Sequence, residues 1–161
     1  RLDPRLGEAV AAAGAGIVVM HSRGPVERMA SYELAVYGPD PVGEVVAELG
    51  AGLERARRAG IPDRAVVLDP GLGFAKRTEH SAAVLAHLDR ILALGRPVLV
   101  GPSRKRFVGE LAGGLPPEER LEGTIAACVV ALARGARLFR VHDVAPVRRA
   151  LAVAEALLTA P

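Results

Sequence analysis

Hydrophobic residues along this chain alternate between short runs and longer periodic stretches. Four short runs rich in Val, Ile and Leu have the length of β-strands and lie at 17–20, 65–68, 98–100 and 138–141. Apolar residues at helical spacing mark the stretches at about 40–59, 79–94, 117–134 and 144–158. In the second of these, Val84, Leu88 and Ile91 recur every three or four residues. Gly60 stands where the first helix should end.

Strands that alternate with helices predict βαβ units and an α/β fold with a parallel sheet. The segment MHSRGPVERM at the end of the first strand has one glycine, so it lacks the glycine-rich fingerprint of a doubly wound sheet that binds nucleotides. The other architecture is a (β/α)8 TIM barrel, in which functional residues stand at the carboxyl ends of several strands. Each of the four predicted strands here ends in polar residues. The pattern therefore favours the barrel.

The length of the chain fits only part of such a barrel. An eight-stranded barrel needs about 250 residues, whereas this chain has 161 residues and four predicted units. Its opening stretch, RLDPRLGEAVAAAGAG, is typical of a helix that follows an earlier strand. We therefore expect residues 1–161 to be the C-terminal half of a single barrel domain, supplying about the last four βα units.

Composition and charge argue against several classes of function. The net charge is +3, and no basic stripe with interleaved aromatic residues indicates nucleic-acid binding. No apolar run reaches the ~18 residues of a membrane-spanning helix. Asp3 and Glu8 precede the apolar stretch 9–20, where a signal peptide would be basic. The lone cysteine, Cys128, lies in an apolar run, so we expect it to pack in the core of a cytoplasmic protein.

The first candidate for chemistry is the acid in VVLDPGLGFAK. Asp69 ends the second predicted strand, and Pro70 with the two following glycines indicates a tight turn. A carboxylate at a strand end can accept two parallel hydrogen bonds from a guanidine-like group. The alternative is an acid that caps the backbone of its own loop.

Basic residues follow the third strand, in the segment GPSRKRF directly after Gly101. Ser103, Arg104, Lys105 and Arg106 suit an anionic or carbonyl-bearing ligand, and a solvated basic loop is the alternative.

The fourth strand ends in FRVHDV. Alternation along a strand places Arg140 and His142 on the same side. Beside a helix N-terminus, these two residues suit a phosphate group. A salt bridge between Arg140 and Asp143 is the alternative.

Together, an acid, a basic loop and an Arg-x-His segment at one edge predict a site for a flat heterocycle with a phosphate tail. No spacing of His, Cys and carboxylate residues resembles a set of metal ligands, so we predict no metal ligand in this chain. His21 is expected to be a buried, hydrogen-bonded histidine, while His80 and His87 are expected on helix surfaces.

The motifs LDPGLGFAK, LVGPSRKRF and RVHDV, in this order and spacing, resemble those of the dihydropteroate synthases, the sulfonamide targets of folate biosynthesis. The segment VVMHSRG at 18–24 resembles the Met-His segment of that family, and the resemblance covers essentially the whole chain. It implies a cytoplasmic transferase, a homodimer, with small-molecule substrates. The enzyme would condense 6-hydroxymethyl-7,8-dihydropterin diphosphate with p-aminobenzoate to give 7,8-dihydropteroate and diphosphate.

The resemblance also implies roles for individual residues. Asp69 would hold the amino-pyrimidine edge of the pterin, and Lys105 would reach its carbonyl and ring nitrogen. Arg140 and His142 would bind the pyrophosphate. Lys76 matches a lysine of the family pattern and is expected to be peripheral. The substrate-binding residues expected are Met20, Asp69, Phe74, Gly101, Ser103, Lys105, Arg106, Arg140 and His142, with Lys105, Arg140 and His142 also catalytic.

This chain departs from the family pattern in what it lacks. The first four strands are missing, with their substrate loops and an asparagine linked to magnesium, and the chain contains no asparagine at all. We therefore expect Mg²⁺ to be bound only in the N-terminal half, and this chain alone to be inactive.

Two alternatives remain open. One is a pterin-binding domain of the methyltransferase type, which would share the barrel and the pterin acid. The motifs SRK and RVHD argue against it, because such enzymes have no pyrophosphate to hold. The other alternative is a non-catalytic half-barrel whose open edge binds a partner.

Overall fold

A computed structural model describes residue 3 and residues 5–160 of the chain. The strands are β1 (Ile17–Met20), β2 (Val66–Asp69), β3 (Leu99–Val100) and β4 (Leu138–Phe139). The α-helices are α1 (Leu6–Ala12), α2 (Pro41–Arg58), α3 (Thr78–Ala86), α4 (Leu88–Leu92), α5 (Arg106–Leu111), α6 (Leu121–Ala133) and α7 (Val144–Leu158). Short 3-10 helices are η1 (Val26–Arg28), η2 (Tyr32–Leu34), η3 (Asp63–Ala65) and η4 (Pro117–Glu119). The predicted alternation of strands and helices is confirmed.

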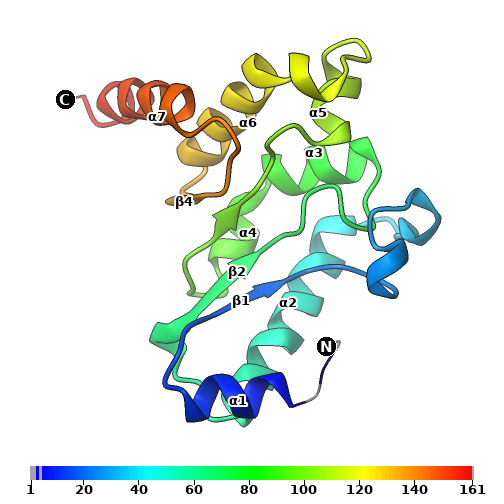
Figure 1. Cartoon of the computed structure of the whole chain (residues 1–161), viewed down its shortest axis with the longest axis vertical. Coiled ribbons are helices and arrows are strands. Elements are labelled where there is room, and N and C mark those ends of the chain that lie inside the picture. The colour runs from blue at the N-terminus through cyan, green and yellow to red at the C-terminus, as the bar shows by residue number, and fades with distance from the viewer. Residues whose placement is uncertain (1–2, 4, 161) are drawn as a thin grey trace.

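The four strands run parallel in the order of the chain (Figure 1). β1 pairs with β2 along its whole length, with Met20 opposite Asp69. β3 pairs with β4, and a parallel bridge between Leu68 and Val98 joins the two pairs. Because parallel strands end at the same edge of a sheet, the loops that follow them lie near one another.

Helix α2 forms where its local signals predict. The Asp40 side chain caps it by accepting a hydrogen bond from Gly43 N at 2.9 Å, and Pro41 occupies its first turn. Arginines in its last turn interact favourably with the negative end of the helix dipole. Gly60 follows the helix with a φ of 85°, a conformation that favours glycine.

Helices cover one face of the sheet. α2 contacts β1 and β2, and its buried residues Val45 and Leu49 share a core with Leu68, Val84 and Val100. The apolar stripe of α2 recurs every three or four residues, so one helix face supplies these contacts. In the part of the chain that is described, no helix is long and apolar enough to cross a membrane.

The opposite face of the sheet is open within the described residues. Val18 on β1 is 49% exposed and Leu138 on β4 is 40% exposed, although both are strand residues with large apolar side chains. Between them, Val67 and Leu99 are half-buried. Parallel sheets are usually covered on both faces, whereas in these residues only one face is covered.

Two predicted helices are divided in the structure. The helix expected at 79–94 is broken at His87, whose φ and ψ of −116° and 39° are not helical, so α3 and α4 are separate. The stretch 117–134 consists of η4 followed by α6. Apolar periodicity continues across the break at His87, because Leu88 and Ile91 of α4 are buried in the same core as Val84 of α3. η4 has no buried residue.

Two other boundaries also differ from the prediction. α5 was not predicted, because a helix of six residues is too short to show a period. β4 ends at Phe139, so Arg140 and His142 lie beyond it. Arg140 N still donates to Val100 O at 3.0 Å, which continues the ladder by one residue.

A polypeptide of these 161 residues alone is expected to self-associate. The open face leaves Val18 and Leu138 in water, and the edges of β1 and β4 present unpaired backbone groups. A backbone polar group left without a hydrogen bond lowers the free energy of unfolding by about 1–3 kcal/mol, and a whole domain is stable by only ~5–15 kcal/mol. Light scattering should therefore show dimers or larger species.

A charge on the open face tests the cause of this association. Val18→Lys should shift the population toward monomer, whereas Val36→Lys, at a loop position that is 73% exposed, should not. A stable monomer of the unsubstituted polypeptide with cooperative unfolding would contradict the prediction.

Candidate functional site

Side chains from successive strand ends meet at the carboxyl edge of the sheet. Arg140, after β4, places Nη2 3.8 Å from Oδ2 of Asp69 at the end of β2. Gly101, after β3, lies next to this arginine, and a Cβ there would be in ordinary contact with Arg140 Nε at 3.4 Å. Lys105 is close enough for its charge to act on Asp69. The structure thus gathers four residues that the sequence singled out.

Asp69 combines the two roles considered for it. Its residue is 3% exposed, and Oδ1 accepts a hydrogen bond from Gly71 N at 2.7 Å, so the acid does cap its own loop. Its other oxygen, Oδ2, is the one nearest Arg140. Burial raises the pKa of Asp69, while the bond from Gly71 and the positive charge of Arg140 act in the opposite direction.

Lys105 is half-buried and lies against an aromatic ring. Its Nζ stands 3.5 Å from the centroid of the Phe74 ring, a cation–π contact between the loops after β3 and β2. Burial lowers the pKa of Lys105, and the charge of Arg140 lowers it further, while Asp69 opposes both. Lys105 is therefore a cation at a partly desolvated position, where its charge acts more strongly than in water.

Ser103 and His142 form a hydrogen-bonded pair across the loops after β3 and β4. Ser103 Oγ lies 2.9 Å from His142 Nδ1 and accepts from His142 N at 3.1 Å. Ser103 is buried, whereas His142 and Arg140 are exposed. The loop thus holds the imidazole by Nδ1 and by its backbone.

The alternative of a salt bridge between Arg140 and Asp143 is wrong. Asp143 is paired instead with Arg104, whose Nη2 and Nε lie 2.8 and 3.1 Å from its two carboxylate oxygens. The hydrogen bond from Arg104 lowers the pKa of Asp143. This bidentate pair leaves the Arg140 guanidinium to Asp69.

Arg106 contacts different groups from Lys105, its neighbour in the sequence. Its guanidinium lies 3.3 Å from the centroid of the Tyr32 ring, and Nε lies 3.6 Å from Glu110 Oε1. Arg106 is also exposed. In a solvated loop, Lys105 and Arg106 would have similar surroundings. In the structure they contact different aromatic rings.

Lys76, which was expected to be peripheral to the site, is a buried residue that is only 1% exposed. Its Nζ lies 2.7 Å from Nδ1 of His21 and donates to the carbonyl oxygens of Gly71 and Phe74, each at 3.2 Å. Burial lowers the pKa of Lys76 to about 7, although the charge of Asp69 opposes this. The expectation that His21 is a buried, hydrogen-bonded histidine is confirmed.

Sequence reasoning missed the contribution of the segment between β1 and α2. Ala75 has a φ of 46°, and both of its backbone groups are bound by that segment. Ala75 N donates to Met29 O at 2.6 Å, and Tyr37 donates its hydroxyl proton to Ala75 O at 2.9 Å. The Tyr37 ring also lies 4.7 Å from the ring of His80, which is half-buried, whereas His87 is exposed as expected. No motif marks Met29 or Tyr37, and only the scarcity of tyrosine draws attention to the latter.

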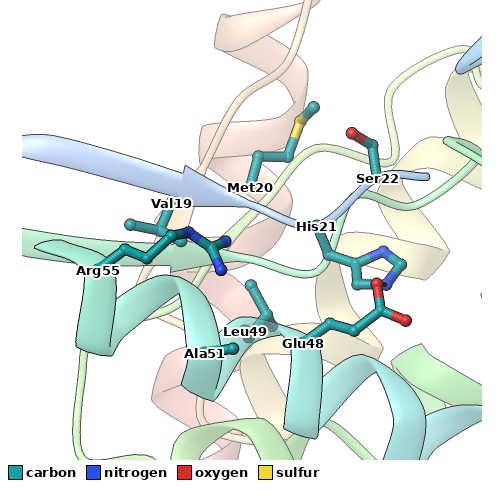
Figure 2. A pocket seen from close by; sticks show the side chains of 8 residues that line it. All are labelled: Val19, Met20, His21, Ser22, Glu48, Leu49, Ala51 and Arg55. Atoms are coloured by element: carbon teal, nitrogen blue, oxygen red, sulfur yellow. Dashed lines mark ion pairs between the residues drawn. The ribbon is translucent and has the colours of Figure 1, made fainter. Parts of the chain in front are cut away.

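A cavity of about 160 Å³ lies between β1 and α2, and His21 is one of the residues that line it. Figure 2 shows His21 turned toward Glu48, while the side chains of Met20 and Ser22 point the other way. His21 Nε2 lies 3.2 Å from Glu48 Oε2. Met20 lines this cavity, and its side chain points away from α2 (Figure 2).

Within the described residues, no group of three or more His, Cys, Asp and Glu side chains could hold a metal ion. The acids at the strand ends, Asp69 and the Arg104-paired Asp143, are outnumbered by cations, which suits an organic anion better than a metal ion.

A comparison with families of known proteins finds a match to the pterin binding enzymes over residues 1–142. The chain belongs to this family. Among curated pterin binding enzymes, it is 40% identical to the dihydropteroate synthase of Synechocystis over 96% of its own length and 53% of that protein. It is also 42% identical to the inactive dihydropteroate synthase 2 of Mycobacterium leprae, over 92% of this chain and 52% of the relative.

Solved structures of pterin binding enzymes have the same fold. Dihydropteroate synthase from Thermus thermophilus in complex with 4-aminobenzoate is 49% identical, with a TM-score of 0.89 over 96% of this chain and 59% of that one. The α/β fold therefore matches that of dihydropteroate synthases. The chain spans about half the length of the curated relatives it matches.

Proposed function

We propose that this chain supplies part of the active site of a dihydropteroate synthase. The observation that carries the proposal is the buried Asp69 carboxylate, bordered by Lys105 and Arg140, at the carboxyl edge of a parallel sheet. The likeness to dihydropteroate synthases over nearly the whole chain supports it. The four parallel strands with one open face would be the last four βα units of a (β/α)8 barrel whose other strands cover that face.

One group of site residues would bind the dihydropterin ring. Asp69 would bind the amino-pyrimidine edge of the dihydropterin, and Lys105 its carbonyl and ring nitrogen, with Met20 packing against the ring. Lys105 meets the pterin from a half-buried position beside Asp69, where opposite charges can bind the two edges of one polar heterocycle.

A second group of residues would bind p-aminobenzoate and the diphosphate. Phe74 and the loop that contains Gly101, Ser103 and Arg106 would form the wall beside p-aminobenzoate. Arg140 and His142, both exposed at the strand ends, would hold the diphosphate. Ser103 would orient His142 through its bond to Nδ1, which leaves Nε2 for the anion.

The chemistry needs a group that stabilises a leaving anion more than it needs a base. The carbon–oxygen bond between the pterin methylene and the diphosphate breaks, and the electron pair leaves with the diphosphate. The aniline nitrogen of p-aminobenzoate then forms the new carbon–nitrogen bond and loses one proton to solvent. Cations placed in advance, here Lys105, Arg140 and His142, favour this separation of charge.

Further features of the whole enzyme belong to the same proposal. The described residues do not fit a magnesium site, so we assign no step to Mg²⁺ and expect any such ion to be held by residues outside this chain. We propose a cytoplasmic homodimer without nucleic-acid or membrane partners. These 161 residues alone should not turn over substrate, because one face of the site is open.

A second candidate is a non-catalytic pterin binding protein. The chain is 42% identical to the inactive synthase 2 of Mycobacterium leprae and 40% identical to the synthase of Synechocystis. Overall identity therefore does not distinguish an active relative from an inactive one, and this favours the second candidate. The methyltransferase alternative is less well supported, because the exposed Arg140 and His142 would have no diphosphate to bind.

Calorimetry and product analysis on the full-length protein that carries these residues separate the candidates. The protein should bind the dihydropterin diphosphate and then form 7,8-dihydropteroate when p-aminobenzoate is added, as detected by mass spectrometry. Binding without product would favour the non-catalytic candidate, and absence of binding would overturn the proposal.

A further inference from the structure

Lys76 is a buried lysine that the proposed reaction does not use. Its Nζ is within hydrogen-bond distance of three groups, His21 Nδ1 and the carbonyl oxygens of Gly71 and Phe74. An ammonium has three N–H donors and no acceptor, so these three partners satisfy it when all three accept. The ammonium form thus has an acceptor for each proton, although burial disfavours its charge and lowers the pKa of Lys76 to about 7.

The third acceptor depends on the proton of His21. Nδ1 can accept only when the proton of the neutral ring is on Nε2, and Nε2 faces Glu48 Oε2 at 3.2 Å. Figure 2 shows this arrangement, with the imidazole turned toward Glu48. Glu48 therefore favours the tautomer of His21 that accepts from Lys76.

The two carbonyl groups held by Lys76 differ in their other contacts. Gly71 is fixed independently: its N donates to Asp69, its O accepts from Phe74 N at 3.0 Å, and a Cβ there would be only 1.9 Å from His21 O. Phe74 O accepts a hydrogen bond from Lys76 Nζ, and Lys105 Nζ lies over the ring of Phe74. The removal of Lys76 should therefore disturb Phe74 more than Asp69.

We propose that Lys76, oriented by His21 and Glu48, is a positioning residue that fixes the Phe74 wall against Lys105 for the aromatic amine substrate. This inference rests on the proposed function, because the wall is assigned to p-aminobenzoate there. Lys76 acts through the backbone of its own loop and touches no reacting atom. Its role is distinct from that of Lys105, the only other lysine of the chain.

Lys76→Met in the full-length protein tests the proposal, since methionine fills the buried space without donating hydrogen bonds. The KM for p-aminobenzoate should rise about tenfold, the scale expected from one lost hydrogen bond. The Kd for the dihydropterin diphosphate and kcat should change by less than about threefold, because Asp69 keeps its bond from Gly71. Arg58→Met, at an exposed position in the last turn of α2, is the matched control and should change none of these values.

A second readout does not depend on catalysis. Fluorophenylalanine labels few positions, since this chain has three phenylalanines, and Phe74→Leu identifies the Phe74 signal. In Lys76→Met this fluorine resonance should shift and broaden while that of the buried Phe107 stays in place. If the unsubstituted protein fails to bind p-aminobenzoate, the proposed function fails, and the Phe74 resonance still reports whether Lys76 positions the ring.

Lys76→Gln keeps an amide donor and should give a smaller change in the same direction. It also decides the matter if Lys76→Met does not fold. A folded variant in which either the Phe74 resonance or the KM for p-aminobenzoate is unchanged would overturn the proposal.

Discussion

Asp69→Asn is expected to weaken binding of the dihydropterin by about 2–4 kcal/mol in the full-length protein, a loss of about 30- to 1000-fold in affinity. Asparagine has the same shape and can still accept from Gly71 N, so the loop should keep its conformation. What disappears is the buried negative charge that the guanidine-like edge of the pterin would meet. Titration calorimetry with the dihydropterin diphosphate measures the effect.

The stability of this variant separates binding from folding. Burial raises the pKa of Asp69, so the folded protein holds this carboxylate at a cost, and the neutral amide should not lower the melting temperature. Asp89→Asn, at an exposed position on α4, is the matched control and should leave binding unchanged. Unchanged pterin affinity in a folded Asp69→Asn protein would remove Asp69 from the site.

Lys105→Ala is expected to reduce kcat/KM about 10²- to 10³-fold, the range seen when one electrostatic group that stabilises a transition state is removed. Lys105 is half-buried, carries its charge over the Phe74 ring and lies close enough to Asp69 for the two charges to interact. Because the charge is partly desolvated, water replaces it poorly. Steady-state kinetics of the full-length protein with both substrates measure the loss.

Arg106→Ala is the matched comparison for Lys105→Ala. Arg106 is exposed, stacks on Tyr32 and pairs with Glu110, so its removal should cost less than about tenfold in kcat/KM. Equal losses in the two variants would favour a solvated basic loop without a specific role for Lys105. The melting temperature of each variant shows whether the loss arises from unfolding.

Much of the site was predictable because it depends on where strands end. The apolar runs located the strands, and the polar residues that follow them, among them Asp69, Lys105 and Arg140, had to meet at one edge once the sheet was parallel. Because β4 ends before both Arg140 and His142, strand alternation does not set the directions of these two side chains. Arg140 meets Asp69 while His142 meets Ser103, so the two side chains contact different partners.

The misjudged residues share a different property, since their surroundings come from distant parts of the chain. Lys76 was expected to be peripheral, and nothing in the sequence around it indicated burial. It is buried because His21, 55 residues earlier, and the carbonyl groups of its own folded loop supply its hydrogen bonds. In the same way, Asp143 pairs with Arg104, 39 residues away, instead of with its near neighbour Arg140.

The sequence by itself determined the order of strands and helices, the extent of α2 and the strand-end positions of Asp69, Lys105 and Arg140, because each of these follows from local periodicity and local turn or capping chemistry. The tertiary structure alone decided which cation meets which acid, which lysine is buried, and that the segment between β1 and α2 binds both backbone groups of Ala75. The physical reason is that hydrogen bonds and ion pairs depend on distances of a few ångströms between side chains. Those distances are set only when the crossovers bring loops from separate βαβ units to the same edge of the sheet.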